Sequence, residues 1–314
     1  MPAFTATAPG KFILFGEHAV VYGEPALAFP ISTVQARAYV NASIKGNPGE
    51  IYIEAPDISL FAPVLDLDVD HPLRAAVVAV LGEKGLGDIP ACKIRVSSTI
   101  PPASGLGSGA AVSVAIIRAF SAFLGQRLSD EQVSHLTYQV EKIHHGTPSG
   151  IDNTVITYKK PIYYQKGEPF QFLSIGSPFF ILIANSGIPG RTLEAVQRVH
   201  QNWINDRERY DSVFKSIGVI SKKAKQLINT GSPVELGPLM DENHSLLQEL
   251  EVSSPELDRL INAAREGGAL GAKLSGGGLG GNIIALVDEG VDQVKEALNS
   301  AGAVNTIIST IPVT

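Results

Sequence analysis

Glu141 and Asp152 are two carboxylates joined by a turn-rich segment, and a lysine, Lys11, lies near the N-terminus. Phosphoryl transfer uses these residue types: a carboxylate holds Mg²⁺, and an aspartate accepts the proton of the attacking hydroxyl. Lys11 could neutralise a phosphate, while Glu17 and His18 could hydrogen-bond a polar substrate. Composition alone favours the plainer interpretation, in which Glu141 is a surface residue and Asp152 caps a turn. The neighbouring segments must therefore decide.

A glycine-rich loop precedes an alanine-rich apolar run. It reads Pro101-Pro102-Ala103-Ser104-Gly105-Leu106-Gly107-Ser108-Gly109-Ala110-Ala111. Glycine lets the backbone approach an anion closely, and the unpaired N–H groups of a helix's first turn carry about +0.5 charge. The loop therefore indicates a phosphate-binding site.

Two better-known phosphate loops fit this chain less well. The P-loop pattern is absent, because Gly10-Lys11-Phe12 lacks the serine or threonine that must follow the lysine. Gly105, Gly107 and Ala110 do match the dinucleotide fingerprint G-x-G-x-x-A. However, Pro101-Pro102 stands where that fingerprint needs a strand, and proline cannot donate to a sheet. A dinucleotide site and a tight turn without a ligand both remain alternatives.

The segment from Lys273 to Gly281 is also rich in glycine, as are the surroundings of Gly10 and Gly105. It holds five glycines in the six residues that begin at Gly276. Such a run does not form the interior of a helix or a sheet. It is either a floppy connection or, as its position before a strand favours, an ordered turn close to a ligand.

Composition and charge limit the class of protein. The chain has 314 residues, 44% of them hydrophobic and 18% charged, with a formal net charge of −6. This charge disfavours a general nucleic-acid binder. The single cysteine, Cys92, excludes an intramolecular disulfide and suits a reducing compartment. The apolar stretch at Phe12–Phe15 is too short for a signal peptide, and other apolar runs are shorter than a membrane span. We expect a cytoplasmic protein with neither a membrane nor a nucleic-acid partner.

Hydrophobic periodicity predicts elements that would position these residues. Strand-like patterns cover residues 4–7, 33–43, 93–98, 178–184, 282–287 and 305–311, and helical patterns cover 73–81, 108–124, 130–143, 193–229, 234–249, 255–266 and 291–300. Ser129 and Gln132 form a capping box for the helix that begins at Asp130. Long polar helices follow residue 177, so we expect domains at 1–177 and 178–314 with a cleft between them. The last strands and helix resemble a split βαβ half-domain.

Several of these segments together resemble the motifs of the GHMP small-molecule kinases. They are Ala8–Lys11 with Phe15–Gly23, the loop Pro101–Ala111, and Lys273–Gly281. Within the family, Gly16–Gly23 and His145–Asn153 are similar to the members that phosphorylate mevalonate, and Asn185–Thr192 resembles a segment near their substrate. The resemblance implies an α+β, two-domain GHMP kinase fold. Its N-terminal domain would be like ribosomal protein S5 domain 2, its C-terminal domain ferredoxin-like, and its active site would lie between them.

The resemblance also implies a reaction, in which ATP phosphorylates the 5-hydroxyl of mevalonate to give 5-phosphomevalonate and ADP, in the mevalonate pathway to isoprenoid precursors. By similarity, Asp152 is the catalytic base, Lys11 assists the reacting hydroxyl, and Glu141 and Ser108 hold Mg²⁺. The residues that would bind ATP are Pro101, Ala103, Ser104, Gly105, Leu106, Gly107, Ser108, Gly109 and Ala110. Those on the mevalonate side would be Glu17, His18, Gly150, Ser275, Gly276 and Gly277. We also expect a homodimer.

One residue departs from the family pattern. GHMP kinases usually read Gly-Leu-Gly-Ser-Ser-Ala where this chain has Gly109 in place of the second serine. In family members that serine's hydroxyl commonly reaches Mg²⁺ or a phosphate, which Gly109 cannot do. Ser104, Ser108 or a water could substitute, so we expect an altered metal shell and an active enzyme.

Other functions remain open from the sequence. A kinase of the same superfamily could act on phosphomevalonate, homoserine or galactose, because the shared loops bind ATP whatever the acceptor. A non-catalytic nucleotide or sugar sensor would bind ATP without turnover, although the presence of both Glu141 and Asp152 argues against it. A dehydrogenase would bind NAD and not ATP.

Overall fold

The computed structural model describes residues 3–84, 89–102, 104–145, 148–288 and 290–314. Contacts divide the chain into two compact units. The first contains the residues up to Lys11 together with Pro30–Pro101 and Gly107–Lys159, and the second contains Phe12–Phe29, Pro102–Leu106 and Lys160–Thr314. Each unit therefore consists of three separate stretches of the chain. The boundary expected at residues 177 and 178 refers to family domains and stays a prediction.

The first unit contains a β-sheet with one buried face. Its strands are β1 (Phe4–Phe15), β2 (Ala26–Ala42), β3 (Ile51–Ala55), β4 (Leu60–Pro63) and β5 (Cys92–Ser98), and β1 and β2 also contribute residues to the second unit. β2 runs antiparallel to β5, β5 runs parallel to β3, and β4 runs antiparallel to β3. In β5, Ile94 and Val96 are buried while Lys93 and Arg95 are exposed. This alternation leaves one face for helices to cover.

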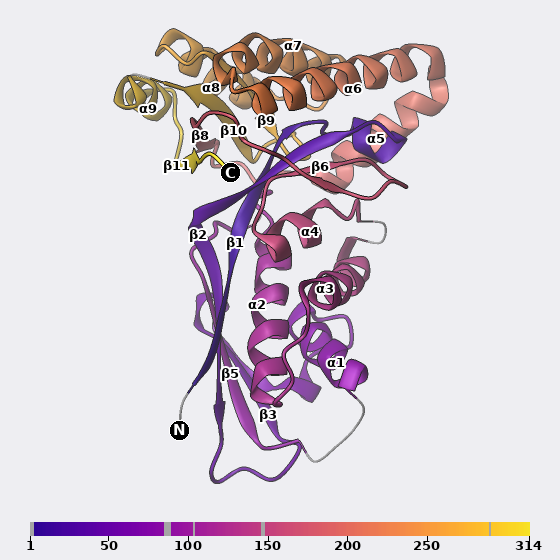
Figure 1. The fold of residues 1–314 in the computed structure, drawn as a ribbon, viewed down its shortest axis with the longest axis vertical. Coiled ribbons are helices and arrows are strands. Elements are labelled where there is room, and N and C mark those ends of the chain that lie inside the picture. The colour runs from indigo at the N-terminus through magenta and orange to yellow at the C-terminus, as the bar shows by residue number, and fades with distance from the viewer. Residues whose placement is uncertain (1–2, 85–88, 103, 146–147, 289) are drawn as a thin grey trace. The chain divides into compact units, whose positions relative to one another are not determined.

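Four helices lie along one face of these strands (Figure 1). They are α1 (Pro72–Lys84), α2 (Ser108–Phe123), α3 (Asp130–His145) and α4 (Ile151–Tyr158). α2 is apolar on most of its surface and largely buried, as expected of a central helix. The predicted capping box of α3 is confirmed: the Ser129 amide donates to Gln132 Oε1 at 3.0 Å, and the Gln132 amide donates to Ser129 Oγ at 3.2 Å.

The second unit contains a four-stranded antiparallel sheet in the order β11-β8-β10-β9. Its strands are β8 (Phe179–Asn185), β9 (Gly271–Ser275), β10 (Asn282–Val287) and β11 (Asn305–Ile311). Along the chain, helices follow β8, and one helix follows β10. This order of strands and helices is that of a ferredoxin-like unit. The expected split βαβ arrangement is confirmed.

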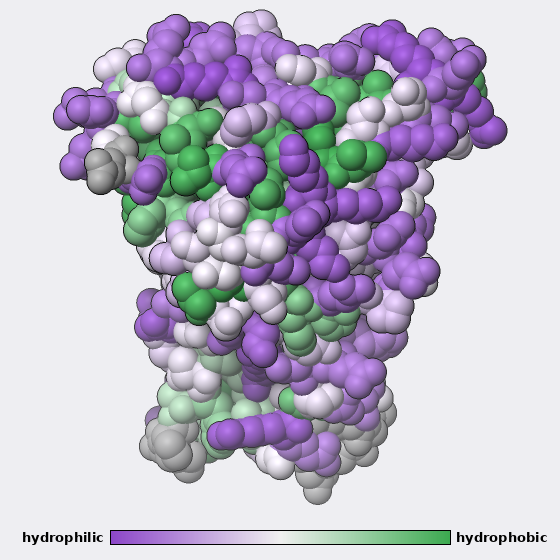
Figure 2. Space-filling model, turned by 45° about the horizontal axis from the view of Figure 1, so that its top comes forward, coloured by the Kyte–Doolittle hydropathy of each residue, from purple (hydrophilic) through white to green (hydrophobic). Residues whose placement is uncertain are grey.

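Helices cover this sheet and present polar side chains outward. They are α5 (Thr192–Asn205), α6 (Arg207–Thr230), α7 (Leu236–Glu249), α8 (Pro255–Glu266) and α9 (Val291–Ser300). Shorter elements of this unit are η1 (Ala19–Tyr22), β6 (Ile162–Tyr164), β7 (Gln171–Phe172) and η4 (Pro233–Glu235). Polar residues predominate on the outer helical surface in the upper part of Figure 2. Within the described ranges, no helix is long and apolar enough to cross a membrane.

One predicted helix was wrong, and one helix was not predicted. The helix predicted over 193–229 is two helices, because the backbone of Asp206 is not helical, with φ and ψ of −144° and 74°, and its side chain accepts the Arg209 amide as the N-cap of α6. No helix or strand was predicted over residues 151–158. Instead, Gly150 takes a positive φ of 90° and α4 begins at the next residue. Its short length and its β-branched residues conceal the helical pattern.

Two predicted strands were too short, and strand β9 was not predicted. β1 and β2 both extend well beyond the predicted residues 4–7 and 33–43, and β9 was not predicted. Every residue of β9 and of β10 is buried, so neither strand shows the alternation that marks a half-buried strand. Helix α7 approaches β9 closely through glycines: a Cβ at Gly271 would lie 2.1 Å from the carbonyl oxygen of Gly237.

This approach predicts a large cost for one methyl group. Gly271→Ala should lower the free energy of unfolding by at least about 2 kcal/mol, because the obstructing atom is backbone and cannot rotate away. The matched control is Gly82→Ala in α1, where, among the described residues, no atom outside the helix's own backbone lies within 4 Å of the added Cβ. That change should be neutral or stabilising by up to about 1 kcal/mol. Denaturant titration of both variants is the test, and similar small effects would contradict the assigned contact.

Candidate active site

Lys11 in β1 and Asp152 in the first turn of α4 form an ion pair within the first unit. The distance from Lys11 Nζ to Asp152 Oδ1 is 3.0 Å. The lysine side chain is 7% exposed and the aspartate side chain 28% exposed. Asp152 therefore has a fixed cationic neighbour and still remains reachable from outside. The structure brings together the two residues that the sequence predicts to be catalytic.

Glu141, on α3, lies beside this pair and is nearly buried, with 8% of the residue exposed. Burial raises the pKa of its carboxyl group, the negative charge of Asp152 raises it further, and Lys11 offsets part of the effect. Its Oε1 atom lies 3.7 Å from the position that a Cβ at Gly109 would take. The first turn of α2 therefore adjoins a carboxylate that needs positive charge to remain ionised.

The predicted phosphate loop leads into α2 as expected. Gly105 and Gly107 have φ values of 78° and 73°, and Gly107 is the N-cap of α2. A Cβ at Gly107 would lie 2.7 Å from Ile156 Cδ1 and 2.9 Å from Lys11 Cγ. Glycine is thus required here by both conformation and packing.

The residues around these glycines have different environments. The first turn of α2, all of whose residues are described, carries no acidic side chain. Ser108 in that turn is partly exposed, Pro101 is partly exposed, Ala110 is buried, and the side chain of Leu106 is buried. The Ser104 carbonyl accepts a hydrogen bond from Asn282 Nδ2, within the second unit. Ala103, also predicted to bind ATP, lies outside the described residues.

A second charge pair lies in the second unit. Lys273 Nζ, on β9, donates to Glu17 Oε1, and it also donates to the Leu274 carbonyl at 2.7 Å. The two side chains are 0% and 1% exposed. Burial lowers the pKa of Lys273, and the Glu17 carboxylate opposes this shift. Sequence reasoning assigned no role to Lys273. The signal that could have indicated a buried lysine is its place between two apolar residues, Ala272 and Leu274.

His18, next to Glu17, is also buried. Its Nε2 atom lies 3.0 Å from the carbonyl oxygen of Gly277, so Nε2 carries the proton and donates it, and Nδ1 is an acceptor. Burial lowers the pKa of His18 to about 4, with the nearby Lys273 charge acting in the same direction. The imidazole is therefore neutral near pH 7. The structure brings together the predicted substrate residues Glu17, His18 and Gly277.

The glycine-rich segment after β9 is an ordered turn. Gly276 and Gly278 have φ values of 89° and 82°, and the Leu279 amide donates to the Val252 carbonyl at 2.8 Å. A Cβ at Gly278 would lie 2.0 Å from that same carbonyl oxygen. Ser275, the preceding residue, donates through Oγ to the Ile13 carbonyl at 2.8 Å.

The segment at 185–192 packs against this turn. Ser186 Oγ donates to the Gly281 carbonyl at 2.9 Å, and the Gly281 amide donates to the Ile188 carbonyl at 2.7 Å. Of the predicted substrate residues, Gly150 alone belongs to the first unit, where it precedes α4. The others, which include Ser275 and Gly276, belong to the second.

Two family models match the chain: the GHMP kinases N terminal domain over residues 72–160 and the GHMP kinases C terminal over residues 224–304. A curated relative named mevalonate kinase from Thermococcus onnurineus is 38% identical over 319 residues, covering 95% of this chain and 93% of its own length. One of the same name from Pyrococcus horikoshii is 36% identical and covers 96% and 94%. The chain belongs to the GHMP kinase family. It is a kinase, as the sequence predicts.

Solved structures agree with this GHMP kinase assignment. The mevalonate kinase of L. major in complex with R-mevalonate superposes with a TM-score of 0.84 at 29% identity, covering 99% of this chain and 96% of that one. The mevalonate kinase of Methanococcus jannaschii gives 0.83 at 28% identity, covering 100% and 99%. The predicted two-domain GHMP kinase fold is confirmed.

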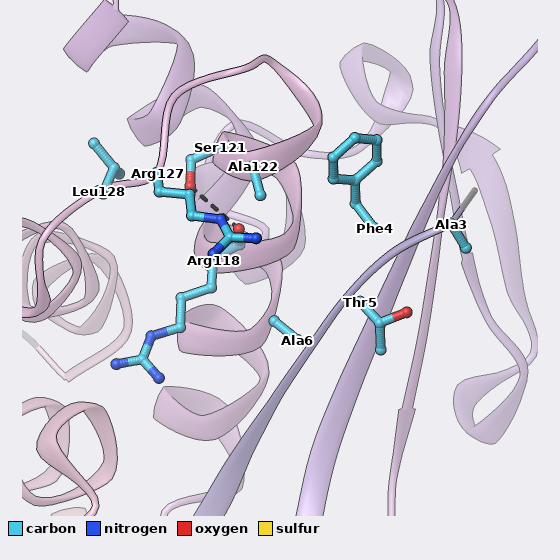
Figure 3. Close-up of a pocket in the computed structure, with 9 residues that line it drawn as sticks. All are labelled: Ala3, Phe4, Thr5, Ala6, Arg118, Ser121, Ala122, Arg127 and Leu128. Atoms are coloured by element: carbon cyan, nitrogen blue, oxygen red, sulfur yellow. Dashed lines mark hydrogen bonds between the residues drawn. The ribbon is translucent and has the colours of Figure 1, made fainter. Parts of the chain in front are cut away.

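A recess of about 540 Å³ opens elsewhere in the first unit of this GHMP kinase (Figure 3). Its walls are Ala3, the first three residues of β1, the end of α2 and the segment that follows α2. Arg118, which lines it, is already bound to Asp130 and to the Thr157 carbonyl. None of the predicted site residues lines this recess.

The buried ion pair predicts unequal effects of single and double substitutions. Lys273→Met should lower the free energy of unfolding by about 3 kcal/mol, because the buried Glu17 carboxylate loses its ammonium partner. The double variant Glu17→Gln, Lys273→Met should recover part of this loss, since no buried charge then remains. Urea unfolding of the wild type, Lys273→Met, Glu17→Gln and the double variant measures the coupling. Strictly additive losses would show that the two residues do not interact.

Proposed function

We propose that this GHMP kinase transfers the γ-phosphoryl group of ATP to the 5-hydroxyl of mevalonate, forming 5-phosphomevalonate and ADP. The observation that carries the proposal is the Lys11–Asp152 ion pair at 3.0 Å beside the buried Glu141. It is supported by relatives of 36–38% identity that are named mevalonate kinase, and by the structural match whose title names R-mevalonate. A cytoplasmic location and a homodimer, both expected from the sequence, belong to the same proposal.

In the proposed transfer, Asp152 accepts a proton and Lys11 stabilises the negative charge that develops. Asp152 accepts the proton of the 5-hydroxyl while the hydroxyl oxygen bonds to the γ-phosphorus and the bond to the β-phosphate oxygen breaks. Lys11, fixed against Asp152 and packed on Gly107, places positive charge where the alkoxide develops. Because phosphoryl transfer depends mainly on positioning and charge stabilisation, this buried and immobile lysine suits the reaction.

Glu141 fits a magnesium ion. Mg²⁺ is usually bound through one or two carboxylates plus substrate phosphates, and it neutralises phosphate charge when bound. Glu141 is a nearly buried carboxylate whose pKa is raised by burial and by Asp152, so a neighbouring dication would restore its charged form. In the proposal, Glu141 holds the ion, Ser108 contributes its hydroxyl, and the loop 101–110 binds the ATP phosphates.

Glu17 and His18 hold the acceptor substrate in this proposal. Mevalonate is a small hydroxy acid, so its recognition requires fixed hydrogen-bonding groups and not a broad apolar surface. His18 offers a neutral imidazole fixed by Gly277, and Glu17 offers a carboxylate fixed by Lys273. Ser275 and Gly276, which precede and begin the glycine-rich turn, and Gly150, which precedes α4, would offer backbone groups to the substrate in this proposal.

An ADP-release assay with four acceptors tests the proposed function. Purified protein with ATP and Mg²⁺ is given mevalonate, phosphomevalonate, homoserine or galactose, and the position of the new phosphate is determined by NMR. We expect release with mevalonate and a product phosphorylated at the 5-hydroxyl. Release only with another acceptor would identify a different GHMP kinase. Binding of ATP without release for any acceptor would favour a sensor.

The assigned base predicts a specific kinetic loss. Asp152→Asn should lower kcat for mevalonate by about 10²-fold or more, because the amide cannot accept the hydroxyl proton. Asp130→Asn is the matched control, since Asp130 also pairs with a cation, Arg118, but lies outside the proposed site. It should retain the wild-type kcat. Steady-state kinetics decides, and a fully active Asp152→Asn protein would remove the role assigned to this residue.

Because Gly109 lacks the family's serine hydroxyl, we expect that a serine at this position raises the affinity for Mg²⁺. Gly109→Ser should lower the Mg²⁺ concentration for half-maximal rate by about tenfold, the scale of a lost or gained supporting ligand. A Cβ here is only 3.7 Å from Glu141 Oε1, an ordinary contact, so the fold should tolerate it. Gly109→Ala adds the same Cβ without the hydroxyl and should leave the Mg²⁺ dependence unchanged. Identical titrations for the two variants would mean that the missing serine has no consequence here.

A further inference from the structure

His18 has a strained backbone. Its φ and ψ are 60° and −51°, and the amide of Ala19 donates to the carbonyl of Glu17 at 2.7 Å. A three-residue turn closed in this way with positive φ is the rare and strained form of the γ-turn. Residues held in such conformations persist only where their surroundings determine them, and they concentrate at functional sites.

The segment after His18 ties this turn to a short helix. The Val21 amide donates to the His18 carbonyl at 3.0 Å, and the Val20 amide donates to the Gly16 carbonyl at 3.1 Å. These bonds make the turn continuous with η1, which ends at Tyr22. The position of η1 therefore sets the position of His18.

Aromatic stacking fixes the far end of η1. The Tyr22 ring lies 4.0 Å from the ring of Phe214 on α6, with 12° between their planes. It also lies 5.1 Å from the ring of Trp203 on α5. Trp203 is held in turn, because its Nε1 donates to Asp211 Oδ1 at 2.8 Å and the Arg207 guanidinium lies 4.4 Å from its ring centre. All of these residues belong to the second unit.

We infer that Tyr22 is a positioning residue for the acceptor substrate: its stack on Phe214 and Trp203 holds the strained turn that presents Glu17 and His18. The inference rests on the proposed function for the identity of that substrate. It concerns an aromatic side chain whose ring contacts residues of α5 and α6. Without the stack, η1 is released and His18 relaxes to an unstrained backbone.

The kinetic consequence follows from the population of the competent turn. If only a fraction of molecules presents Glu17 and His18 correctly, the apparent affinity for the acceptor is the intrinsic affinity multiplied by that fraction. The ATP-binding residues in the loop 101–110 are not part of η1, so ATP affinity should be unaffected. A purely structural role would lower thermal stability without separating the two substrates.

Amide hydrogen exchange tests the turn without any substrate. The peptide covering Ala19–Gly23 is followed in the wild type, in Tyr22→Leu and in Tyr22→Phe, which keeps the ring. We expect exchange about tenfold faster in Tyr22→Leu, and wild-type exchange in Tyr22→Phe. If Tyr22→Leu does not fold, Tyr22→Met replaces it, since its flexible chain fills irregular space. Unchanged exchange in the folded variant would overturn the inference.

Steady-state kinetics tests the consequence for binding. Tyr22→Leu should raise KM for mevalonate about tenfold and leave KM for ATP within about twofold, while Tyr22→Phe restores both. Equal increases of the two KM values, or an unchanged KM for mevalonate, would refute the positioning role. A wild-type protein inactive with mevalonate would instead refute the proposed function, and the exchange experiment would still decide on the turn.

Discussion

The second unit depends on a charge pair that is removed from water. Lys273 and Glu17 are 0% and 1% exposed, and they are 256 residues apart in the chain. Burying an ion costs several kcal/mol, which only close pairing and additional hydrogen bonds can offset. Lys273 meets this requirement with two acceptors, Glu17 and the Leu274 carbonyl. The segment that follows β1 and strand β9 must therefore come together for the unit to be stable.

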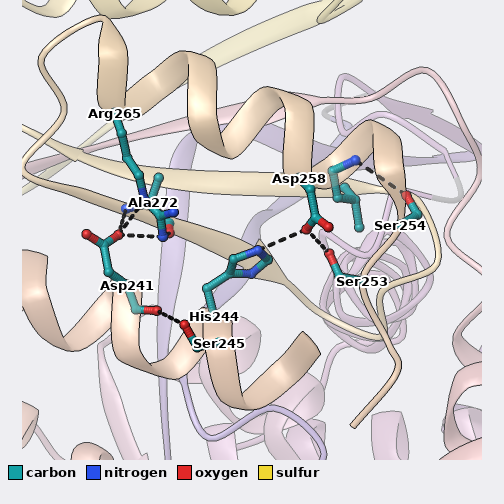
Figure 4. Close-up of polar contacts among 9 residues, drawn as sticks. Asp241, His244, Ser245, Ser253, Ser254, Asp258, Arg265 and Ala272 are labelled. Carbon is teal, nitrogen blue, oxygen red and sulfur yellow. Dashed lines mark hydrogen bonds and ion pairs between the residues drawn. The ribbon is translucent and has the colours of Figure 1, made fainter. Parts of the chain in front are cut away.

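Helices α7 and α8 fix the strand that carries this lysine. β9 is an edge of its sheet, yet at Ala272 its outward amide donates to Asp241 Oδ1 at 3.0 Å, and its carbonyl accepts from Arg265 Nη2 at 3.0 Å (Figure 4). Asp258 on α8 accepts from Ser253 Oγ and lies 3.0 Å from Nε2 of His244 on α7, which links the two helices. Side chains thus satisfy edge groups that would otherwise pair with another strand. They also set the register of the neighbouring Lys273.

Signals that depend on neighbours in sequence could be predicted, and those that depend on distant residues could not. The Ser129 capping box and the start of α2 after Gly107 are encoded within a few residues, and both agree with the structure. Helix α4 has no such local signal, because Gly150 starts it in place of a capping side chain. The partner of Glu17 could not be found from local pattern, since it is a lysine on a buried strand at the other end of the chain. The catalytic and binding roles come from family resemblance, and the geometry only shows which residues meet.

The glycines of the phosphate loop differ in whether the fold requires glycine at their positions. Gly105 and Gly107 both take positive φ, and at Gly107 a Cβ would meet Ile156 and Lys11 below 3 Å. Conformation requires glycine at both positions, and packing also requires it at Gly107. Gly109 has a helical backbone, and a Cβ added there would lie 3.7 Å from Glu141 Oε1, an ordinary contact distance. The departure from the family pattern therefore occurs where the fold imposes no requirement. Its physical effect is the loss of a hydroxyl next to a buried carboxylate, so any consequence must arise in ion binding and not in stability.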